Sequence, residues 1–251
     1  MTEATSLRIS KPPLVEALLG IEFATNPGFS GFLLGGFWAK VSDVFTKPGL
    51  RDNQAGSPRI KLVSADHNLT LQILDSGFFL SWVVAEGDKA YPGFASLLGQ
   101  FQELYSKYIV FLSEAGFPVP PITALSMGYT NLISKPPEHE GLLVSSVFPD
   151  FQWRASERGL PAPAFVNLGA SFQFPEEGCL VDVKIDGPFP SDDPELSSFL
   201  RLFLQAKGTV EKGTELEKVW NWYKNAKASL NRTFSGLTSK DFRRKYWGEE
   251  N

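Results

Sequence analysis

The sequence predicts an α+β fold, in which mainly antiparallel sheet packs against three principal amphipathic helices. Predicted strands come in adjacent groups and do not alternate one by one with helices, which favours antiparallel pairing. Two pairs of predicted strands flank short turns, at Asp75–Gly77 and at Pro175–Gly178. Three longer segments repeat apolar residues at intervals of three and four, as amphipathic helices do.

The first predicted elements are a strand and a helix joined by a turn. Apolar residues alternate from Leu14 to Phe23, which is the period of a strand with one face mostly buried. Asn26-Pro27-Gly28 predicts a turn. Apolar residues then recur at helical spacing from Leu33 to Phe45. The polar segment Lys47–Ser57, which contains glycine and proline, is predicted as a loop.

A hairpin and the clearest helix complete the first half. The runs Leu69–Leu74 and Phe78–Val84 are apolar and flank Asp75-Ser76-Gly77, which favours a hairpin. From Tyr91 to Leu112 the apolar residues fit helical spacing almost without exception, and Gly116 then ends the helix.

The second half is predicted to be richer in strands and to end in a long helix. The predicted strands cover Ile122–Ile133, Leu142–Phe148, Gln152–Ala155, Phe165–Phe174 and Cys179–Ile185. A short helix is predicted from Asp192 to Ala206, followed by a polar break at Lys207–Gly213. The long helix covers about Glu215–Leu237, and a shorter one follows as far as Tyr246.

The order of elements divides the chain into two halves. Residues 11–118 form a strand–helix–hairpin–helix half, and residues 119–251 form a strand-rich half with the long final helix. At 251 residues we expect these halves to make one compact unit. A further hypothesis is that the two halves are related modules.

Composition indicates a cytoplasmic protein without a membrane segment. Cys179 is the only cysteine, so no intramolecular disulfide is possible, which suits a reducing cytosol. The N-terminal residues do not resemble a signal peptide. No apolar run reaches the roughly 20 residues that span a bilayer.

Charge is distributed unevenly along the chain. The net charge is −4, yet Lys218–Trp247 contains eight basic residues and one acidic residue, a net +7 that leaves −11 elsewhere. Within this segment Arg243, Arg244 and Lys245 precede Tyr246 and Trp247, and basic residues next to aromatic ones suit nucleic acid. Docking on an acidic surface and a solvated helix face are the alternatives.

Two further places carry candidate binding residues. Lys227 falls in the middle of an apolar helical stripe that includes Tyr223, so its amine either extends to solvent or faces a ligand or partner. Asn131 is a polar amide in the apolar run Tyr129–Ile133 and needs hydrogen-bond partners if it is buried. Tyr129 is a candidate beside it.

Catalytic and metal-binding patterns are absent from the sequence. The two histidines, His67 and His139, lie in predicted turns or loops, and no pair of residues has metal-ligand spacing. Phosphate-binding, nucleotide-binding and nucleophile-elbow motifs are also missing. Asp182 and Asp186 flank Lys184 on a polar strand face, which is either solvated or catalytic. We therefore predict no metal, cofactor or catalytic residue.

An ordered set of short motifs resembles a family of bacterial proteins. They are Pro-Pro-Leu-Val-Glu-Ala-Leu-Leu-Gly-Ile-Glu-Phe (12–23), Phe37-Trp38, Phe79-Leu-Ser-Trp82, Tyr91-Pro92, Gly128-Tyr129-Thr130-Asn131-Leu132-Ile133, and a C-terminal helix with Phe234 before Leu237-Thr238. This set spans nearly the whole chain and is similar to a sporadically distributed family of uncharacterised bacterial proteins. Members often carry a histidine where this chain has Lys227.

That resemblance implies no activity or cofactor. The patchy distribution implies accessory gene neighbourhoods such as phage-defence or toxin–antitoxin modules. The leading hypothesis is a non-enzymatic cytosolic binding or accessory protein that acts through a protein partner. The alternatives are an enzyme such as a nuclease or small-molecule hydrolase, using Lys227 or Asp182, and a small-ligand binder with an aromatic-lined cavity.

Overall fold

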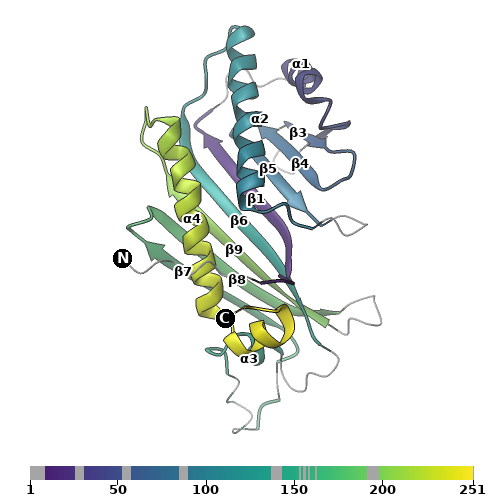
Figure 1. Cartoon of the computed structure of the whole chain (residues 1–251), viewed down its shortest axis with the longest axis vertical. Helices are drawn as coiled ribbons and strands as arrows, with labels where there is room; N and C mark the ends of the chain where they lie inside the picture. Colours follow the sequence, from purple (N-terminus) through teal and green to yellow (C-terminus); the bar gives the residue numbers. More distant parts are fainter. Residues whose placement is uncertain are drawn as a thin grey trace. The chain divides into compact units, whose positions relative to one another are not determined.

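A nine-stranded antiparallel sheet and five α-helices make up the described residues, which confirms the predicted α+β class. The computed structural model describes residues 9–25, 31–52, 58–84, 90–136, 143–152, 154, 157, 159–161, 163–190 and 198–250. Strand order in the sheet is β2-β3-β4-β5-β1-β6-β9-β8-β7 (Figure 1). The elements are β1 (Leu14–Phe23), α1 (Gly31–Val41), β2 (Lys47–Asp52), β3 (Pro58–Val63), β4 (Leu69–Leu74), β5 (Gly77–Val83), α2 (Phe94–Glu114), β6 (Ile122–Ser134), α3 (Leu143–Val147), β7 (Val166–Phe174), β8 (Cys179–Pro190), β9 (Ser198–Thr209), α4 (Leu216–Leu237), α5 (Lys240–Phe242) and the π-helix η2 (Arg243–Trp247).

Two compact units share these elements. Unit 1 comprises Met1–Val15, Tyr129–Lys207 and Trp222–Asn251, and unit 2 comprises Glu16–Gly128 and Gly208–Asn221. Each unit is therefore assembled from segments that lie far apart in the chain. The predicted halves, residues 11–118 and 119–251, stay a prediction.

Aromatic rings of α2 form the centre of unit 2. Tyr108 stacks on Phe78 of β5, with 5.1 Å between ring centroids, and meets Phe37 of α1 edge to face at 5.2 Å. All three side chains are fully buried. Tyr105 lies 5.7 Å from Phe78, and burial, with a smaller contribution from Tyr108, raises its pKa to about 12. Large buried rings contribute most of the apolar area that stabilises this unit.

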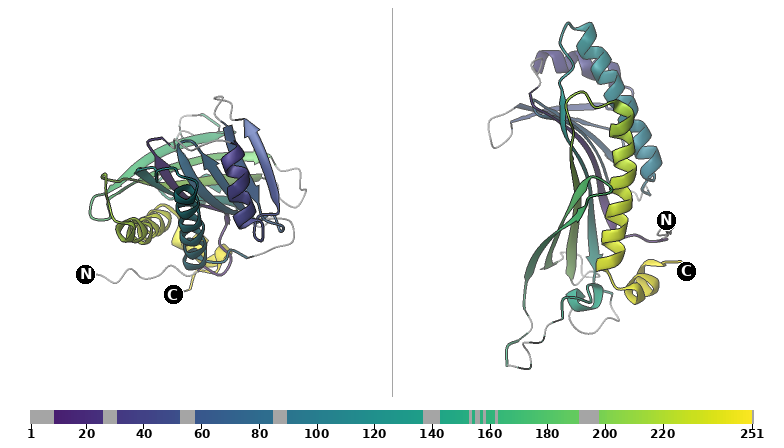
Figure 2. Two further views of the ribbon diagram at one scale, coloured as in Figure 1. Left: turned by 90° about the horizontal axis from the view of Figure 1, so that it is seen from above. Right: turned by 90° about the vertical axis from the view of Figure 1, so that its left-hand side faces the viewer.

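In unit 1, helix α4 covers one face of the sheet. It lies along one face of β7, β8 and β9 (Figure 2). From Trp222 onward, its buried residues include Tyr223, Ala226 and Leu230, which recur at helical spacing. On β8 and β9 every second residue is buried, because successive strand side chains point to opposite faces. The buried apolar residues that follow this alternation are Val181, Val183, Ile185, Leu200, Leu202, Leu204 and Ala206.

Both predicted hairpins form. Strands β4 and β5 pair from Leu69↔Trp82 to Leu74↔Gly77, and β7 and β8 pair from Val166↔Gly187 to Phe174↔Cys179. Their turns contain the glycine and polar residues on which the prediction depended. The strand Ile122–Ile133 and the helices starting near Leu33, Tyr91 and Glu215 also form, with ends shifted by a few residues.

Two predicted elements have the wrong type. Leu142–Phe148 was predicted as a strand, but Leu143–Val147 forms helix α3, which buries three side chains of the run. A short apolar run fits either structure by its periodicity alone. Asp192–Ala206 was predicted as a helix, but β9 occupies Ser198–Thr209 and pairs with β8. The helix-start signal at Asp192-Asp193-Pro194, which lies outside the described residues, obscured the two-residue alternation that follows it.

Other segments also differ from the prediction. Lys47–Asp52, predicted as a loop, forms strand β2, which pairs with Pro58–Val63 because a tertiary partner outweighs weak strand propensity. The polar break predicted at Lys207–Gly213 begins later, since β9 continues to Thr209. Gln152 and Arg154 are not in a strand, while the other residues of the predicted strand Gln152–Ala155 lie outside the described residues.

We expect Gly20→Ala and Gly99→Ala to have opposite effects on stability. A Cβ at Gly20 in β1 would lie 2.3 Å from the ring of Phe79 and 2.5 Å from the hydroxyl of Ser126, so alanine overpacks the site and costs about 1–3 kcal/mol. Gly99 is exposed within α2 with nothing within 4 Å of a Cβ, so alanine adds about 0.5–1 kcal/mol of helix propensity. Urea unfolding of both variants measures the change in the free energy of unfolding. A Gly20→Ala protein at least as stable as the wild type would contradict the packing.

Candidate functional site

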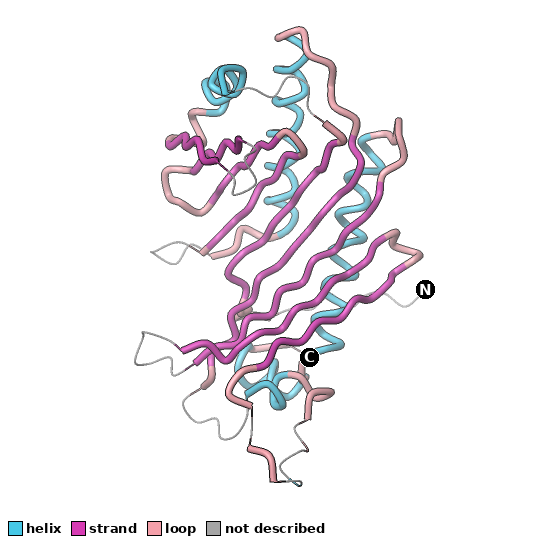
Figure 3. Tube along the Cα trace, turned by 180° about the vertical axis from the view of Figure 1, so that it is seen from behind, coloured by secondary structure: helices cyan, strands magenta, loops and turns pink. Residues whose placement is uncertain are grey.

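A polar groove of about 460 Å³ crosses the face of unit 2 that points away from α2. Figure 3 views the strands from this side. The groove exists because alternate strand residues point away from the helices. Ser81 on β5 lies opposite Thr70 on β4, Thr70 lies opposite Val63 on β3, and Val63 lies opposite Lys47 on β2. These four side chains therefore form one row across four strands.

Small hydroxyl side chains form the floor of the groove. Thr70 and Ser81 are only 6% and 4% exposed, although no helix covers this face in the described part of unit 2. Gln72 and Lys61, which lie opposite each other on β4 and β3, line the groove beside them. The floor therefore offers hydroxyl groups, which both donate and accept hydrogen bonds.

A tightly bonded turn between β3 and β4 presents His67 to the groove. The hydroxyl of Ser64 donates to Asp66 Oδ1 (2.6 Å), and the amide of Leu69 donates back to Ser64 Oγ (3.0 Å). Asn68 ties the turn to β5, since its Nδ2 donates to the carbonyl of Val83 (2.9 Å). His67 itself has φ +61°, which is uncommon for a residue other than glycine. Such conformations persist where the surrounding contacts hold them, and they concentrate at functional sites.

The ring of His67 is paired with Lys47. Lys47 Nζ lies 2.8 Å from His67 Nε2. A protonated lysine has donors only, so Nε2 accepts this hydrogen bond and the proton of the neutral ring sits on Nδ1. Lys61 adds a second cation to this side of the groove, and Glu16 places a carboxylate at the opposite side, on β1.

The sequence analysis did not single out any residue of this groove as a binding residue. Its members come from five strands and one turn, and they meet only through strand pairing that is distant in sequence. The single local signal was the turn composition Asp66-His67-Asn68, which favours left-handed backbone. In the described part of the chain, no three His, Cys, Asp or Glu side chains gather as metal ligands.

The seven residues predicted as binding residues lie instead on three elements of unit 1. Asn131 on β6 is 4% exposed, and its Nδ2 donates to the carbonyl of Leu202 on β9 (3.3 Å), as a buried amide requires. Tyr129, on the same strand, is half-buried. On α4, Tyr223 is fully buried, with its ring 5.1 Å from that of Trp222.

Lys227 is half-buried at the side of the α4 core stripe, not within it. Ala226 is the residue that fills the stripe between Tyr223 and Leu230. Consecutive helical residues point about 100° apart, so this placement turns Lys227 away from the centre of the buried face.

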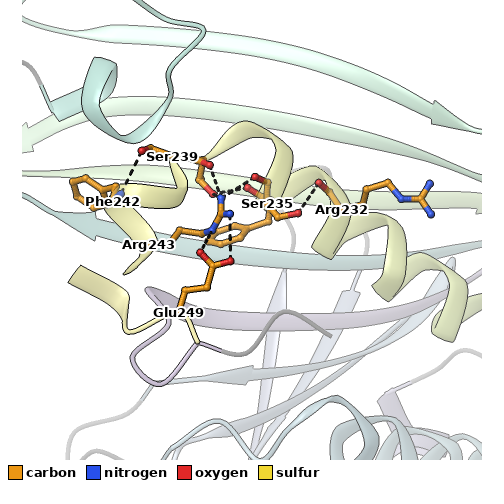
Figure 4. A network of polar contacts seen from close by, with 8 residues as sticks. Arg232, Ser235, Ser239, Phe242, Arg243 and Glu249 are labelled. Carbon is orange, nitrogen blue, oxygen red and sulfur yellow. Dashed lines mark hydrogen bonds and ion pairs between the residues drawn. The ribbon is translucent and has the colours of Figure 1, made fainter. Parts of the chain in front are cut away.

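Arg243 anchors the C-terminal segment to the end of α4 (Figure 4). Its guanidinium is buried and donates to the carbonyl of Ser235 (2.8 Å), to the carbonyl of Thr238 and to Thr238 Oγ1 (2.9 Å). Its Nε pairs with Glu249 Oε2 at 3.0 Å. The N–H donors of the Arg243 guanidinium are therefore used within the protein, although the sequence analysis predicted this side chain as a nucleic-acid contact.

The neighbouring cations are placed differently. Arg244 and Lys245 are exposed, and Lys245 Nζ lies 4.8 Å from the ring centroid of Tyr246. Two of the three basic side chains in the predicted nucleic-acid segment thus reach solvent. Nucleic-acid binding through them stays a prediction.

Charged groups on the polar face of β8 and β9 neutralise one another. Asp186 is 3% exposed and pairs with Arg201 directly across the ladder, with 2.7 Å between Oδ2 and Nη2. Burial raises the pKa of Asp186, but the hydrogen bonds and charges of Arg201 and Lys184 outweigh it, and the pKa lies below its usual range. Hydrogen bonds from Ser171 and Lys207 likewise lower the pKa of Asp182. Both acids are therefore held ionised in pairs, which favours a structural role over proton transfer.

No protein-family model matches the chain, and no curated protein is significantly similar to it. The resemblance to a bacterial family therefore stays a prediction. None of the described helices is both long enough and apolar enough to cross a bilayer.

We expect Arg243→Met to destabilise the protein by about 3 kcal/mol, because it leaves Glu249 and two carbonyl groups without a buried partner. The adjacent exposed Arg244→Met is the matched control and should stay within about 0.5 kcal/mol of the wild type. Urea unfolding compares the two variants. Equal midpoints for both would show that the Arg243 contacts add nothing to stability.

Asp186→Asn should destabilise the protein at pH 7 by about 2 kcal/mol, since the amide loses the charged hydrogen bonds to Arg201. The pKa of Asp186 is lowered in the folded state, so its stabilising effect is complete above about pH 4 and is lost as the pH falls through the folded value. The difference in unfolding free energy between the wild type and Asp186→Asn, measured by urea unfolding, should be smaller at pH 3 than at pH 7. Exposed Asp43→Asn is the control, and a difference that persists unchanged at pH 3 would refute the ion pair.

Proposed function

We propose that this chain is a non-enzymatic binding protein whose groove on unit 2 receives a polar segment of a partner protein. In this proposal an acidic side chain of the partner lies against Lys47 and Lys61, and a donor or cation lies toward Glu16. The observation that carries the proposal is the His67 turn, a strained residue held by several hydrogen bonds beside a charged groove.

The length of the groove favours a segment over a single ion. Glu16 is on β1 and Lys47 is on β2, which are four strand spacings apart in the sheet, about 19 Å. An extended segment of about six residues covers that distance at roughly 3.3 Å per residue. A lone phosphate or carboxylate would reach only one side. The hydroxyl floor suits backbone and polar groups along the segment.

Hydrogen bonding at His67 favours binding over catalysis. A neutral imidazole has one acceptor nitrogen, and in this arrangement Nε2 already accepts from Lys47. The ring therefore lacks the lone pair that a general base needs, while the pair presents a cation to the groove. Removal of Lys47 would free that nitrogen, so the lysine itself keeps the ring in its binding role.

We propose further that the partner is a cytoplasmic protein encoded beside this one. The resemblance to a sporadically distributed bacterial family supports this part of the proposal, because such genes cluster with functional partners in phage-defence and toxin–antitoxin modules. In this proposal, a polar segment of the partner binds in the groove of this chain.

The test compares two double charge reversals with the same net charge change. Lys47→Glu with Lys61→Glu reverses the groove, and Lys224→Glu with Lys240→Glu reverses exposed positions on α4 and α5. We expect wild type to bind a labelled hexaglutamate peptide in fluorescence anisotropy, and the groove variant to bind at least tenfold more weakly, about 1.4 kcal/mol. The control should bind like wild type.

Co-purification with tagged products of the adjacent genes repeats the comparison with natural partners. Loss of the partner from the groove variant alone supports the proposal. Equal retention by both variants, or equal loss, would exclude the groove as the binding site.

A further inference from the structure

The two outermost strands of the sheet differ in how their edges are protected. An outermost strand exposes backbone groups that pair with another chain, and proteins block this with charges, proline or short length. Strand β2, at one end, has six residues, among them Pro48 and three charged residues. Strand β7, at the other end, has nine residues, Val166–Phe174, with no charge and no proline. In Figure 3, β7 is visible as the last strand of unit 1.

The register and exposure of β7 keep this edge available. Its pairing with β8 runs without a shift from Val166↔Gly187 to Phe174↔Cys179, so no bulge turns the strand aside. Five consecutive residues, 169–173, are exposed. Among them Phe172 is 37% exposed, although it pairs with Val181, which is buried on the helix-covered face. Helix α4 thus leaves Phe172 partly exposed, although its Arg232 lies over the ring of Phe174 at the end of the strand.

We propose that β7 pairs antiparallel with β7 of a second copy of this chain, about a two-fold axis at Ala170. Ala170 is the midpoint of the strand, so this register pairs all nine residues. It places Leu168 opposite Phe172 of the second copy on the apolar side, and Asn167 opposite Gln173 of the second copy on the polar side. Aliphatic–aromatic and amide pairs of this kind stabilise antiparallel ladders.

The absence of charge is what selects a second copy as the occupant. A two-fold axis brings identical residues close together, so any charge at the centre of β7 would meet its own copy. Neither face of β7 carries a charge, which makes the strand compatible with itself. A strand of opposite charge has nothing to recognise here. This surface is separate from the groove on unit 2, so the two proposals stand or fall independently.

A charge-exchange experiment tests the pairing on the full chain. Ala170 is exposed, so Ala170→Lys and Ala170→Glu are both accommodated by the single chain. We expect sedimentation velocity to show a dimer for the wild type and monomers for each variant alone. An equimolar mixture of the two variants should restore a dimer, because lysine then faces glutamate. Ala95→Lys on exposed α2 is the control and should remain dimeric.

Disulfide trapping provides a second measurement that does not depend on charge. Residues directly opposite in an antiparallel pair have Cα atoms about 4.5–5.5 Å apart, which lies within the range that a disulfide spans. Ala170→Cys should therefore form a covalent dimer on mild oxidation, while Ala95→Cys should not. The native Cys179 is buried and contributes little background. A monomeric wild type, dimers that persist in both single-charge variants, or no cross-link at position 170 would each overturn the proposal.

Discussion

The alternation of side chains along antiparallel strands decides what this protein presents to its surroundings. Each strand gives one set of residues to the helix-covered side and the other set to solvent. In unit 2 the covered set is aromatic and aliphatic and packs under α2, so its neighbours on the same strands form the floor and sides of the groove. The core and the candidate site are therefore consequences of one pattern. A shift of one residue in any of these strands would exchange them.

The charged residues of the described chain have two different roles. On β8 and β9 they form closed pairs such as Asp186 with Arg201, whose partners lie on adjacent strands of the same unit. Arg243 is similar, because its donors are engaged by α4 and by Glu249. In the groove, Lys47 and Lys61 lie on β2 and β3, and Glu16 lies on β1 at the other side of the same surface. In the proposed function, this separation matches a ligand that has its own charge pattern.

Local signals predicted a large part of the fold. The hairpin at Asp75–Gly77 and helix α2 depend on turn chemistry and on apolar period, both of which lie within short windows of sequence. Strand β2 and the groove depend on pairing between distant segments, which no short window contains. Lys227 illustrates the limit on one helix, since the buried stripe contains Tyr223 and Leu230 as predicted but passes between them through Ala226. His67 stood in a predicted turn, but its contact with Lys47 requires β2 to be in place.

The joining of the two distant ends of unit 1 has a consequence for how the protein matures on the ribosome. Ile9 bridges Glu249, and the amide of Lys11 donates to the carbonyl of Trp247 (3.0 Å). The first of these segments is synthesised long before its partner, because more than 230 residues separate Lys11 from Trp247 in the chain. Unit 1 therefore cannot close until its last segment, Trp222–Asn251, has been synthesised, and its folding is dominated by contacts of large sequence separation, which form slowly. The main segment of unit 2 is continuous from Glu16 to Gly128. The α2 core of this unit can therefore form without residues that are synthesised much later.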